Sequence, residues 1–314
     1  MNEDGSDVRV LVRTPMRGAT TILRLSDPAW SPDARWIYFT AVLEEREAAR
    51  FHYHVTDVFA VSPDGSALRR LTSTGDASFP VPSPDGRKLL YARIERPDER
   101  PPTVGLWLMD AEGGGQRRFL QARKGWIDLP GSWAPDGRRI AFTRCLWPEP
   151  GPGGRIPNTC AVHFASSAGI DVQQIANRAR SPIYSPDGGR IAYVTDRDEN
   201  GTHRLGSDEE GFANELYVME ANGRSPTRLT DTEQLDEEQA SWSSDGSRLA
   251  YGREGPTGFA HQVMVMRADG SCPTRIAGNG AANSARESRD FNQPSWRPGR
   301  LTEDHPELDC GGED

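Results

Sequence analysis

A short turn-and-strand unit recurs along this chain of 314 residues and limits what the chain can fold into. The clearest copy is Ser83-Pro84-Asp85-Gly86, followed by the apolar run Leu89–Tyr91. Pro84 presets φ for the first central position of a type I turn, Asp85 suits the second, and Gly86 takes the positive φ that ends it. The apolar run is typical of a strand that is buried on both faces. Related copies begin at Ser31, Ala134, Ser185 and Ser243, with a clipped copy at Trp296.

The spacing of these copies, about 51 to 58 residues, indicates a propeller or a solenoid. A second apolar run follows most of the turn units, as in Leu106–Asp110, although it is degenerate after the third, and another run follows after a further turn, as in Leu68–Thr72. One period therefore holds four short strands. We name them A (ending at the residue before the turn), B (after the turn), C and D. The pattern predicts an all-β fold, a six-bladed β-propeller of four-stranded antiparallel blades.

The repeat unit resembles the TolB-type, WD-like β-propeller repeat. The resemblance is carried by the turn at Ser185 with Ile191-Ala192-Tyr193, by Leu216–Met219 with Ala221-Asn222-Gly223, and by Arg228-Leu229-Thr230. It covers the chain from about residue 8 to residue 300. It implies a propeller scaffold without defining an activity, because propellers of this kind host binding proteins, accessory domains of enzymes and some enzymes.

The two ends of the chain are predicted to share one blade. Val8–Val12 and Thr21–Leu25 lie at the distance from Trp30 expected of strands C and D, while Ser295 and Trp296 fit strand A. N-terminal strands would then complete the C-terminal blade, and closure would remove free sheet edges. We expect a single propeller over residues 1–302 and an acidic tail over residues 303–314.

Bulk properties exclude some classes of function. The net charge of −9 argues against non-specific binding of nucleic acid, because phosphate contacts need a basic surface. No apolar run reaches the length of a membrane span. The polar, acidic residues after Met1 are not typical of a signal peptide.

Four cysteines allow two disulfides. Cys145 ends a B strand and Cys160 opens the next strand, so the two ends of this hairpin would lie side by side. Cys272 and Cys310 would form a second bond that ties down the tail; four free thiols are the alternative. Disulfides would indicate an extracytoplasmic protein, periplasmic or secreted, and free thiols a cytoplasmic one.

The lengths of the connections predict which face of the propeller carries function. A–B and C–D turns are short and alike, whereas B–C and D–A connections vary, as in Val42–Thr56, Leu146–Asn158 and Thr195–Asn214. The two classes lie on opposite faces of an antiparallel blade. We therefore expect the B–C/D–A face, where the central channel opens, to bind a ligand. Neutral drift of loop length is the alternative.

Three groups of residues on this face are candidate ligands or contacts. His52 and His54, with Asp57 behind them, form a plausible half-site for zinc or another transition metal, the alternative being surface histidines. Trp126 and Trp147 stand beside carboxylates, as in sugar or peptide docking, although either ring could instead pack between blades. Residues just before strand A should line the channel mouth, and those we select are Asp128, Arg180, Glu238 and Gln293.

One segment resembles the start of a calcium loop. Asp196, Asp198 and Asn200 occupy alternate positions before Gly201, but the twelfth position is Ser207 rather than a glutamate. An ordinary B–C turn of this repeat is the alternative.

The sequence favours a binding function over catalysis. It has neither a Gly-x-Ser-x-Gly nucleophile elbow nor a Gly-x-Gly-x-x-Gly dinucleotide motif. We expect a monomeric, non-enzymatic propeller that recognises a peptide, a protein partner or a glycan, with calcium or a transition metal as the only candidate cofactors. The alternatives are a metal-dependent enzyme, similar to a polysaccharide lyase or a hydrolase, acting at His52 and His54, and a module of a larger protein.

Overall fold

The computed structural model describes most of the chain. The described residues are 9–12, 22–48, 51–96, 102–147, 158–200, 203–204, 210–233, 235–255, 261–278, 294–298, 308 and 310.

Four-stranded antiparallel sheets follow one another along the chain, as the repeat predicted. The first four-stranded unit is β1 (Arg24–Trp30), β2 (Ile37–Ala48), β3 (Phe51–Val61) and β4 (Leu68–Arg70). The second is β5 (Ala77–Pro82), β6 (Lys88–Arg96), β7 (Thr103–Asp110) and β8 (Arg117–Arg118), and the third is β9 (Trp126–Trp133), β10 (Arg139–Leu146), β11 (Ala161–Ser166) and β12 (Gln173–Asn177). The fourth is β13 (Ala179–Tyr184), β14 (Arg190–Thr195), β17 (Glu215–Glu220) and β18 (Thr227–Arg228), and the fifth is β19 (Asp236–Trp242), β20 (Arg248–Glu254), β21 (His261–Arg267) and β22 (Thr274–Gly278).

Two features depart from simple repetition. A single parallel bridge between Val104 and Ile127 joins the second and third units into one sheet. The insertion after β14 carries a two-stranded pair, β15 (His203–Arg204) and β16 (Glu210–Gly211). The described residues contain no helix, and so none long and apolar enough to cross a bilayer.

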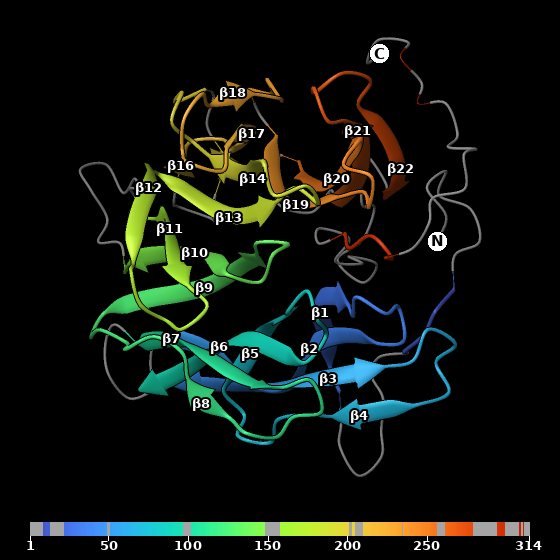
Figure 1. Cartoon of the computed structure of the whole chain (residues 1–314), viewed down its shortest axis with the longest axis vertical. Coiled ribbons are helices and arrows are strands. Elements are labelled where there is room, and N and C mark those ends of the chain that lie inside the picture. Colours follow the sequence, from blue (N-terminus) through green and yellow to red (C-terminus); the bar gives the residue numbers. More distant parts are fainter. Residues whose placement is uncertain are drawn as a thin grey trace.

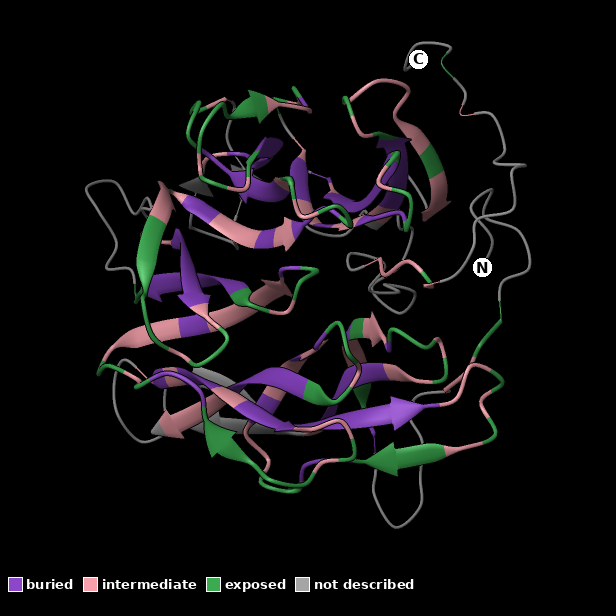
Figure 2. Cartoon of the chain, in the orientation of Figure 1, coloured by how far each residue is buried: buried purple, intermediate pink, exposed green. Residues whose placement is uncertain are grey.

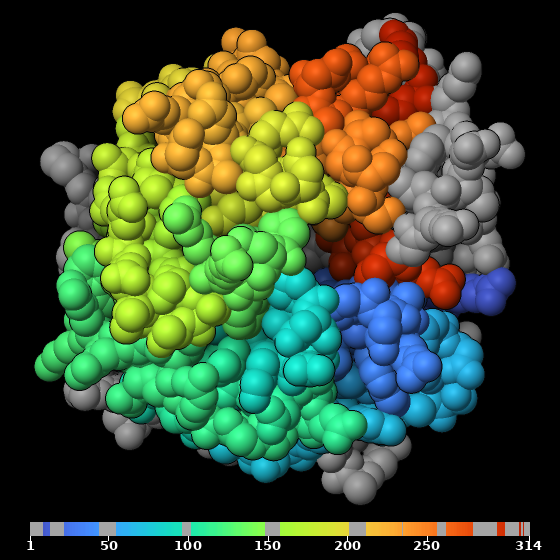
Figure 3. Space-filling view, in the orientation of Figure 1, coloured from blue at the N-terminus to red at the C-terminus, as the bar shows by residue number. Residues whose placement is uncertain are grey.

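The five units are arranged in chain order around a common centre (Figure 1). Residues 294–298, drawn in red in the space-filling view (Figure 3), lie between the fifth unit and β1. The Nε1 of Trp296 donates to the carbonyl of Ser241 in β19 at 2.9 Å. On the other side, the amide of Trp30 donates to Oγ of Ser295 at 3.4 Å, and the Arg297 guanidinium lies 5.6 Å from the Trp30 ring centre. The segment therefore contacts both the fifth and the first unit.

The core consists of clusters between neighbouring units. Tyr91, Tyr193 and Tyr251 occupy the same position of strand B in three repeats, and each is almost fully buried against the sheet of the preceding unit. Strands B and C carry most of the buried residues, whereas β4 and β8 are exposed (Figure 2). The recurring apolar runs of the sequence are thus the surfaces through which sheets pack on one another.

The A–B turns have the geometry that their sequence predicted. In the second unit, Oγ of Ser83 donates to Oδ1 of Asp85 at 2.6 Å and accepts from the amide of Lys88 at 3.0 Å. Gly86 has a φ of 68°. The hydrogen bond from Ser83 lowers the pKa of Asp85. Since the same bonds recur in the turns at Ser31, Ser185 and Ser243, one local chemistry fixes this edge of the molecule.

The first B–C connection differs from the prediction. We expected a charged loop over Val42–Thr56, but β2 and β3 continue through it as a hairpin in which Glu45 pairs with His54 and Glu47 with His52. A charged sequence can form such a hairpin because its two arms satisfy each other's backbone hydrogen bonds.

The N-terminal segment also differs in part. Arg24 and Leu25 pair with Val42 and Ala41, so they belong to strand A of the first unit and not to a separate strand D. No turn signal interrupts the run from Ile22 into β1, and for this reason the strand simply continues. Residues 9–12 are not in a strand. Leu11 and Val12 nevertheless pack against the buried cluster of the first unit that contains Phe39 and Phe59.

Candidate functional site

The edge of the sheets on the B–C/D–A side is held by a recurring contact between an acidic side chain and an arginine. The start of strand A supplies a carboxylate and the end of strand B supplies an arginine. The pairs are Asp76–Arg93 at 2.9 Å, Asp128–Arg144 at 2.7 Å and Glu237–Arg253 at 3.0 Å. The fourth unit has the same pair with the charges exchanged, Arg178–Asp196 at 3.0 Å. Strand ends at this edge are therefore fixed in four successive units.

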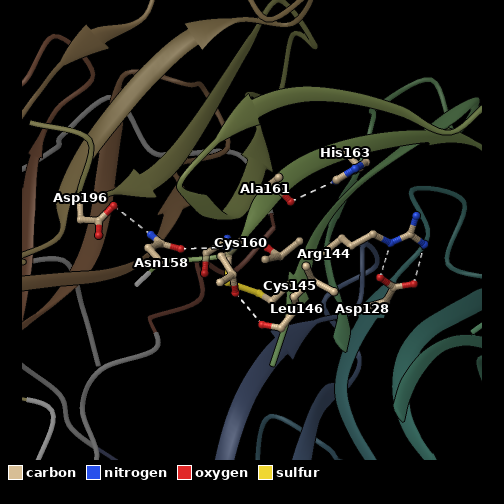
Figure 4. Close-up of a disulfide and its surroundings, with 12 residues drawn as sticks. Asp128, Arg144, Cys145, Leu146, Asn158, Cys160, Ala161, His163 and Asp196 are labelled. Carbon is tan, nitrogen blue, oxygen red and sulfur yellow. Dashed lines mark hydrogen bonds and ion pairs between the residues drawn. A yellow bond between two sulfur atoms is a disulfide. The ribbon is translucent and has the colours of Figure 1, made fainter. Parts of the chain in front are cut away.

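Asp128 is the most deeply paired of the predicted contacts. Its two carboxylate oxygens accept from Nε and Nη2 of Arg144, each at 2.7 Å (Figure 4). The side chains are 1% and 8% exposed. The guanidinium also lies 5.5 Å from the ring centre of Trp126 and 5.2 Å from that of Phe142. Asp128 is thus at the predicted edge, and its carboxylate is directed to its own sheet.

Asp57 takes part in a second repeated network. It is fully buried and accepts from Nη2 of Arg70 at 2.5 Å and from Oγ1 of Thr72 at 2.7 Å. In the fourth unit Glu215 accepts from Arg228 at 2.8 Å and from Thr230 at 2.6 Å. In both units a carboxylate on strand C accepts hydrogen bonds from two side chains at the end of strand D.

The two histidines proposed as metal ligands lie on the first hairpin. His52 and His54 belong to β3, and their side chains lie outside the described part of the structure. The transition-metal site therefore stays a prediction.

The three residues of the calcium-like segment have protein partners. Oδ1 of Asp196 accepts from Asn158 and from Arg178, both at 3.0 Å. Asp198 lies 3.6 Å from Nη1 of Arg228. The Nδ2 of Asn200 donates to Glu215 at 3.2 Å and to Asp231 at 2.9 Å. Gly201 and Ser207 lie outside the described residues, and calcium binding stays a prediction.

The one group of potential metal-ligating side chains within the described ranges lies elsewhere, at the edge of the fifth unit. We call it the acidic cluster: Asp236, Glu238 and Glu254, whose carboxylate oxygens all lie within 4.8 Å of one another. Asp236 is buried and the two glutamates are half-buried. Asp236 and Glu254 are directly opposite in the β19–β20 register, an arrangement of like charges that is destabilising.

Two neighbours stabilise Asp236 in this cluster. The Nη2 of Arg180, from β13, lies 3.7 Å from Oδ2 of Asp236. The amide and Nδ2 of Asn214 donate to its Oδ1 at 2.7 and 2.5 Å. Oδ1 of Asn214 is itself buried with no hydrogen-bond partner within the described part of the chain.

The structure thus brings together two of the predicted contacts, Arg180 and Glu238. Sequence reasoning missed Asp236, Glu254 and Asn214, although each stands at a strand end near this edge. Gln293 lies outside the described residues.

Glu237 points away from the acidic cluster into the sheet. It is fully buried and accepts from Nε of Arg253 at 3.0 Å and from Thr232 at 2.8 Å. Burial raises the pKa of Glu237 to about 8, and the nearby charge of Glu215 adds to the increase while Arg253 opposes it.

Strand A contains a bulge at this edge in several units. Asp27, Phe79 and Ser181 have φ values of 54°, 56° and 54°, in the left-handed region that non-glycine residues seldom adopt. The amides of Phe79 and Ser181 donate at 2.9 Å to the threonine hydroxyls of the preceding unit, Thr40 and Thr143. Backbone held in this region needs support from its surroundings, which these bonds supply.

The two candidate tryptophans flank the third B–C loop. Trp126 is half-buried at the start of β9, opposite Leu146, and Trp147 is 38% exposed. The disulfide between Cys145 and Cys160 closes the base of this loop, as predicted (Figure 4). The second predicted disulfide, Cys272–Cys310, ties the tail to the last C–D turn.

No protein-family profile matches the chain. An uncharacterised protein of Agrobacterium fabrum is 31% identical over 127 residues, 38% of this chain and 40% of that protein. The Tol-Pal system protein TolB of Anaeromyxobacter dehalogenans (strain 2CP-1) is 31% identical over 135 residues, 42% of this chain and 26% of that protein. The matched part therefore spans less than half the length of either relative.

Three solved structures show the fold. A TolB candidate from Agrobacterium tumefaciens has a TM-score of 0.63 at 18% identity and covers 92% of this chain and 89% of its own. TolB from Acinetobacter baumannii has a TM-score of 0.53 at 20% identity, with coverages of 79% and 52%. An oligogalacturonate lyase in complex with manganese has a TM-score of 0.51 at 14% identity, with coverages of 84% and 72%. The fold is that of a TolB-type β-propeller, and at these identities the likeness concerns the fold alone.

Proposed function

We propose that this chain is a six-bladed propeller that acts as a non-enzymatic, monomeric binding scaffold and recognises a protein or peptide on its B–C/D–A face. The observation that carries the proposal is the construction of that face. Pairs of an acid and an arginine fix the strand ends in four units, two of them buried, and the acidic cluster stands among them with two half-buried glutamates. A rigid frame with grouped carboxylates suits a ligand that carries lysine or arginine.

The sixth blade of this proposal would be formed around residues 294–298 and the N-terminal segment. Its support is the position of Trp296, which bonds to the fifth unit, and of Ser295 and Arg297, which contact Trp30 in the first unit. Closure by the two ends of the chain would leave no sheet edge open to pairing with another molecule.

We place the protein outside the cytoplasm. Two disulfides support this location, because such bonds persist in oxidising compartments. Mass mapping without reduction tests it, and four free thiols in protein purified from its own cells would contradict it.

The binding proposal is tested with an array of peptides that differ in net charge, read by fluorescence polarisation in solution. We expect basic peptides to bind and acidic ones not to bind. The variant Glu238→Gln together with Glu254→Gln should weaken binding about tenfold or more, since each removes a charge-assisted hydrogen bond. The control is Glu112→Gln together with Glu220→Gln, which removes the same number of charges from exposed positions at the C–D turns on the opposite face.

Two outcomes would contradict the proposal. Equal weakening by the control and by the cluster variants would mean that the response reflects only overall charge. Binding of oligosaccharides with no binding of peptides, lost in Trp147→Ala, would assign the face to a glycan instead.

A further inference from the structure

The outermost strand of the third unit, β12, departs from the repeat. Each described unit ends in a strand D that lies at the rim of the molecule, away from the common centre (Figure 1). At one position of the C–D register the strand D residue is an arginine in the other four units. These arginines and the strand C residues that they face are Arg70 and Phe59, Arg118 and Trp107, Arg228 and Tyr217, and Arg275 and Met264. In β12 this position holds Gln174, which faces His163.

The acid that binds this arginine in other units also has no counterpart in the third. Asp57 and Glu215, both on strand C, accept hydrogen bonds from Arg70 and Arg228. The residue at the same place in β11 is Ala161. The third unit therefore lacks both members of the pair, and β12 contains no charged residue.

The outer edge of β12 is open to another strand. β12 contains five residues, whereas β4 contains three and β8 and β18 contain two each. The fifth unit's β22 has five residues as well, but it keeps Arg275. Within the described residues β12 pairs with β11 alone, so its outer edge offers main-chain N–H and C=O groups. Figure 2 shows that the strand is largely exposed.

Exposed apolar side chains lead into this edge. Ile170 and Val172 are 59% and 43% exposed, although most large apolar side chains of the sheets are buried. Charged side chains on an edge strand normally prevent pairing with another molecule, and β12 has none. An uncharged edge that follows exposed apolar residues is suited to accept an extended segment by strand addition.

The charges at the two ends of β12 indicate the chemistry of the added strand. Arg178, just after β12, is already paired with Asp196 at 3.0 Å and with Glu199 at 2.7 Å. Asp171, just before β12, is exposed. The strands of this unit pair in antiparallel fashion, and an added antiparallel strand would bring its C-terminal end to Asp171. A basic residue at that end is therefore favoured, since opposite charges across strands stabilise pairing.

We propose that β12 binds an extended segment of a partner protein, which adds a fifth strand to the third unit. The segment is uncharged over most of its length, has apolar residues at alternate positions and carries a basic residue at its C-terminal end. Main-chain hydrogen bonds supply the affinity and the alternate side chains supply the specificity. This edge belongs to the third unit and the acidic cluster to the fifth, so binding at β12 does not depend on the peptide site proposed above.

The probe for this edge is a fluorescein-labelled heptapeptide of alternating threonine and valine that ends in lysine, read by fluorescence polarisation with the full chain. We expect it to bind, and the same peptide with a central proline not to bind, because proline removes a main-chain donor. Gln174→Arg gives β12 the arginine of the other units, so this variant should fold normally and bind about tenfold more weakly or worse. The matched control is Gln121→Arg, an exposed residue outside the strands, which should bind like the unsubstituted chain.

Two further variants separate this edge from other sites. Asp171→Asn should weaken binding of the lysine peptide but not of the same peptide ending in glutamine. Glu238→Gln together with Glu254→Gln should leave binding of the heptapeptide unchanged, even if it abolishes binding of basic peptides at the acidic cluster.

Three results would overturn the proposal. The first is binding that Gln174→Arg leaves unchanged or that Gln121→Arg weakens equally. The second is binding that is lost only in the variant of Glu238 and Glu254, which would place the peptide at the acidic cluster. The third is a dimer of the full chain, seen by sedimentation and abolished by Gln174→Arg, because the occupant of the edge would then be a second copy of the chain.

Discussion

The ion pair between Asp128 and Arg144 allows a quantitative test of whether this edge is structural. The change is Asp128→Asn, which keeps the shape of the side chain but removes its charge. Arg144 would then be left 8% exposed with no counter-charge from residue 128. Removing one partner of a buried pair costs about 3 to 5 kcal/mol, because the remaining charge stays buried.

The size of the change in Tm follows from the length of the chain. The entropy of unfolding is about 2.1 cal/mol/K per residue, which for 314 residues gives about 0.66 kcal/mol/K. A loss of 3 to 5 kcal/mol then lowers Tm by about 5 to 8 °C. Differential scanning calorimetry measures such a shift directly.

The double variant separates the pair from its surroundings. With Asp128→Asn and Arg144→Gln together, no buried charge remains, so we expect the double variant to be less destabilised than the sum of the two single variants. The control is Arg138→Gln in the adjacent exposed turn, which should change stability by less than about 0.5 kcal/mol. Single variants that cost under 1 kcal/mol and simply add would refute the reasoning and would leave Asp128 available for a ligand.

Three further substitutions test other parts of the structure. The pKa of Glu237 is raised in the folded protein, so the stability that this carboxyl contributes is fully present below about pH 4.5 and is lost as the pH rises toward about 8. We therefore expect the Tm of the unsubstituted protein to fall relative to that of Glu237→Gln between pH 5 and pH 8. A difference in Tm that stays constant over this range would contradict the expectation. Replacing Cys145 and Cys160 by serine opens a link across 15 residues and should cost about 3 kcal/mol by urea unfolding, with an unchanged midpoint as the contrary result. In Gly131→Ala the new Cβ would lie 2.4 Å from the carbonyl oxygen of Pro182 in the next sheet, and we expect a loss of about 1 to 3 kcal/mol; native-like stability would show that the two sheets can separate freely.

Features fixed by local chemistry could be predicted from the sequence. The A–B turns depend on a serine, an aspartate and a glycine within a few residues, and Gly86 has the positive φ that the sequence predicted. The disulfide between Cys145 and Cys160 followed from the proximity of the two ends of a hairpin. Such contacts depend little on the rest of the chain.

Features that depend on register were harder to predict. Asp128 lies near the start of strand A, but its partner is set by pairing between β9 and β10, where it faces Arg144. The sequence did contain a signal for this pair. In three repeats an arginine stands two residues after the buried aromatic residue of strand B, at Arg93, Arg144 and Arg253. An acid at the start of strand A in the same repeats completes the pattern.

The fifth unit has, among the described residues, two carboxylates facing each other at the B–C/D–A edge. Asp236 faces Glu254 there, whereas the corresponding residues of the third unit are Ile127 and Cys145. Like charges directly opposite each other lower stability, so a sheet that only repeats a stable design has no structural reason to bring them together. A basic peptide bound at this edge, as proposed above, accounts for the exception.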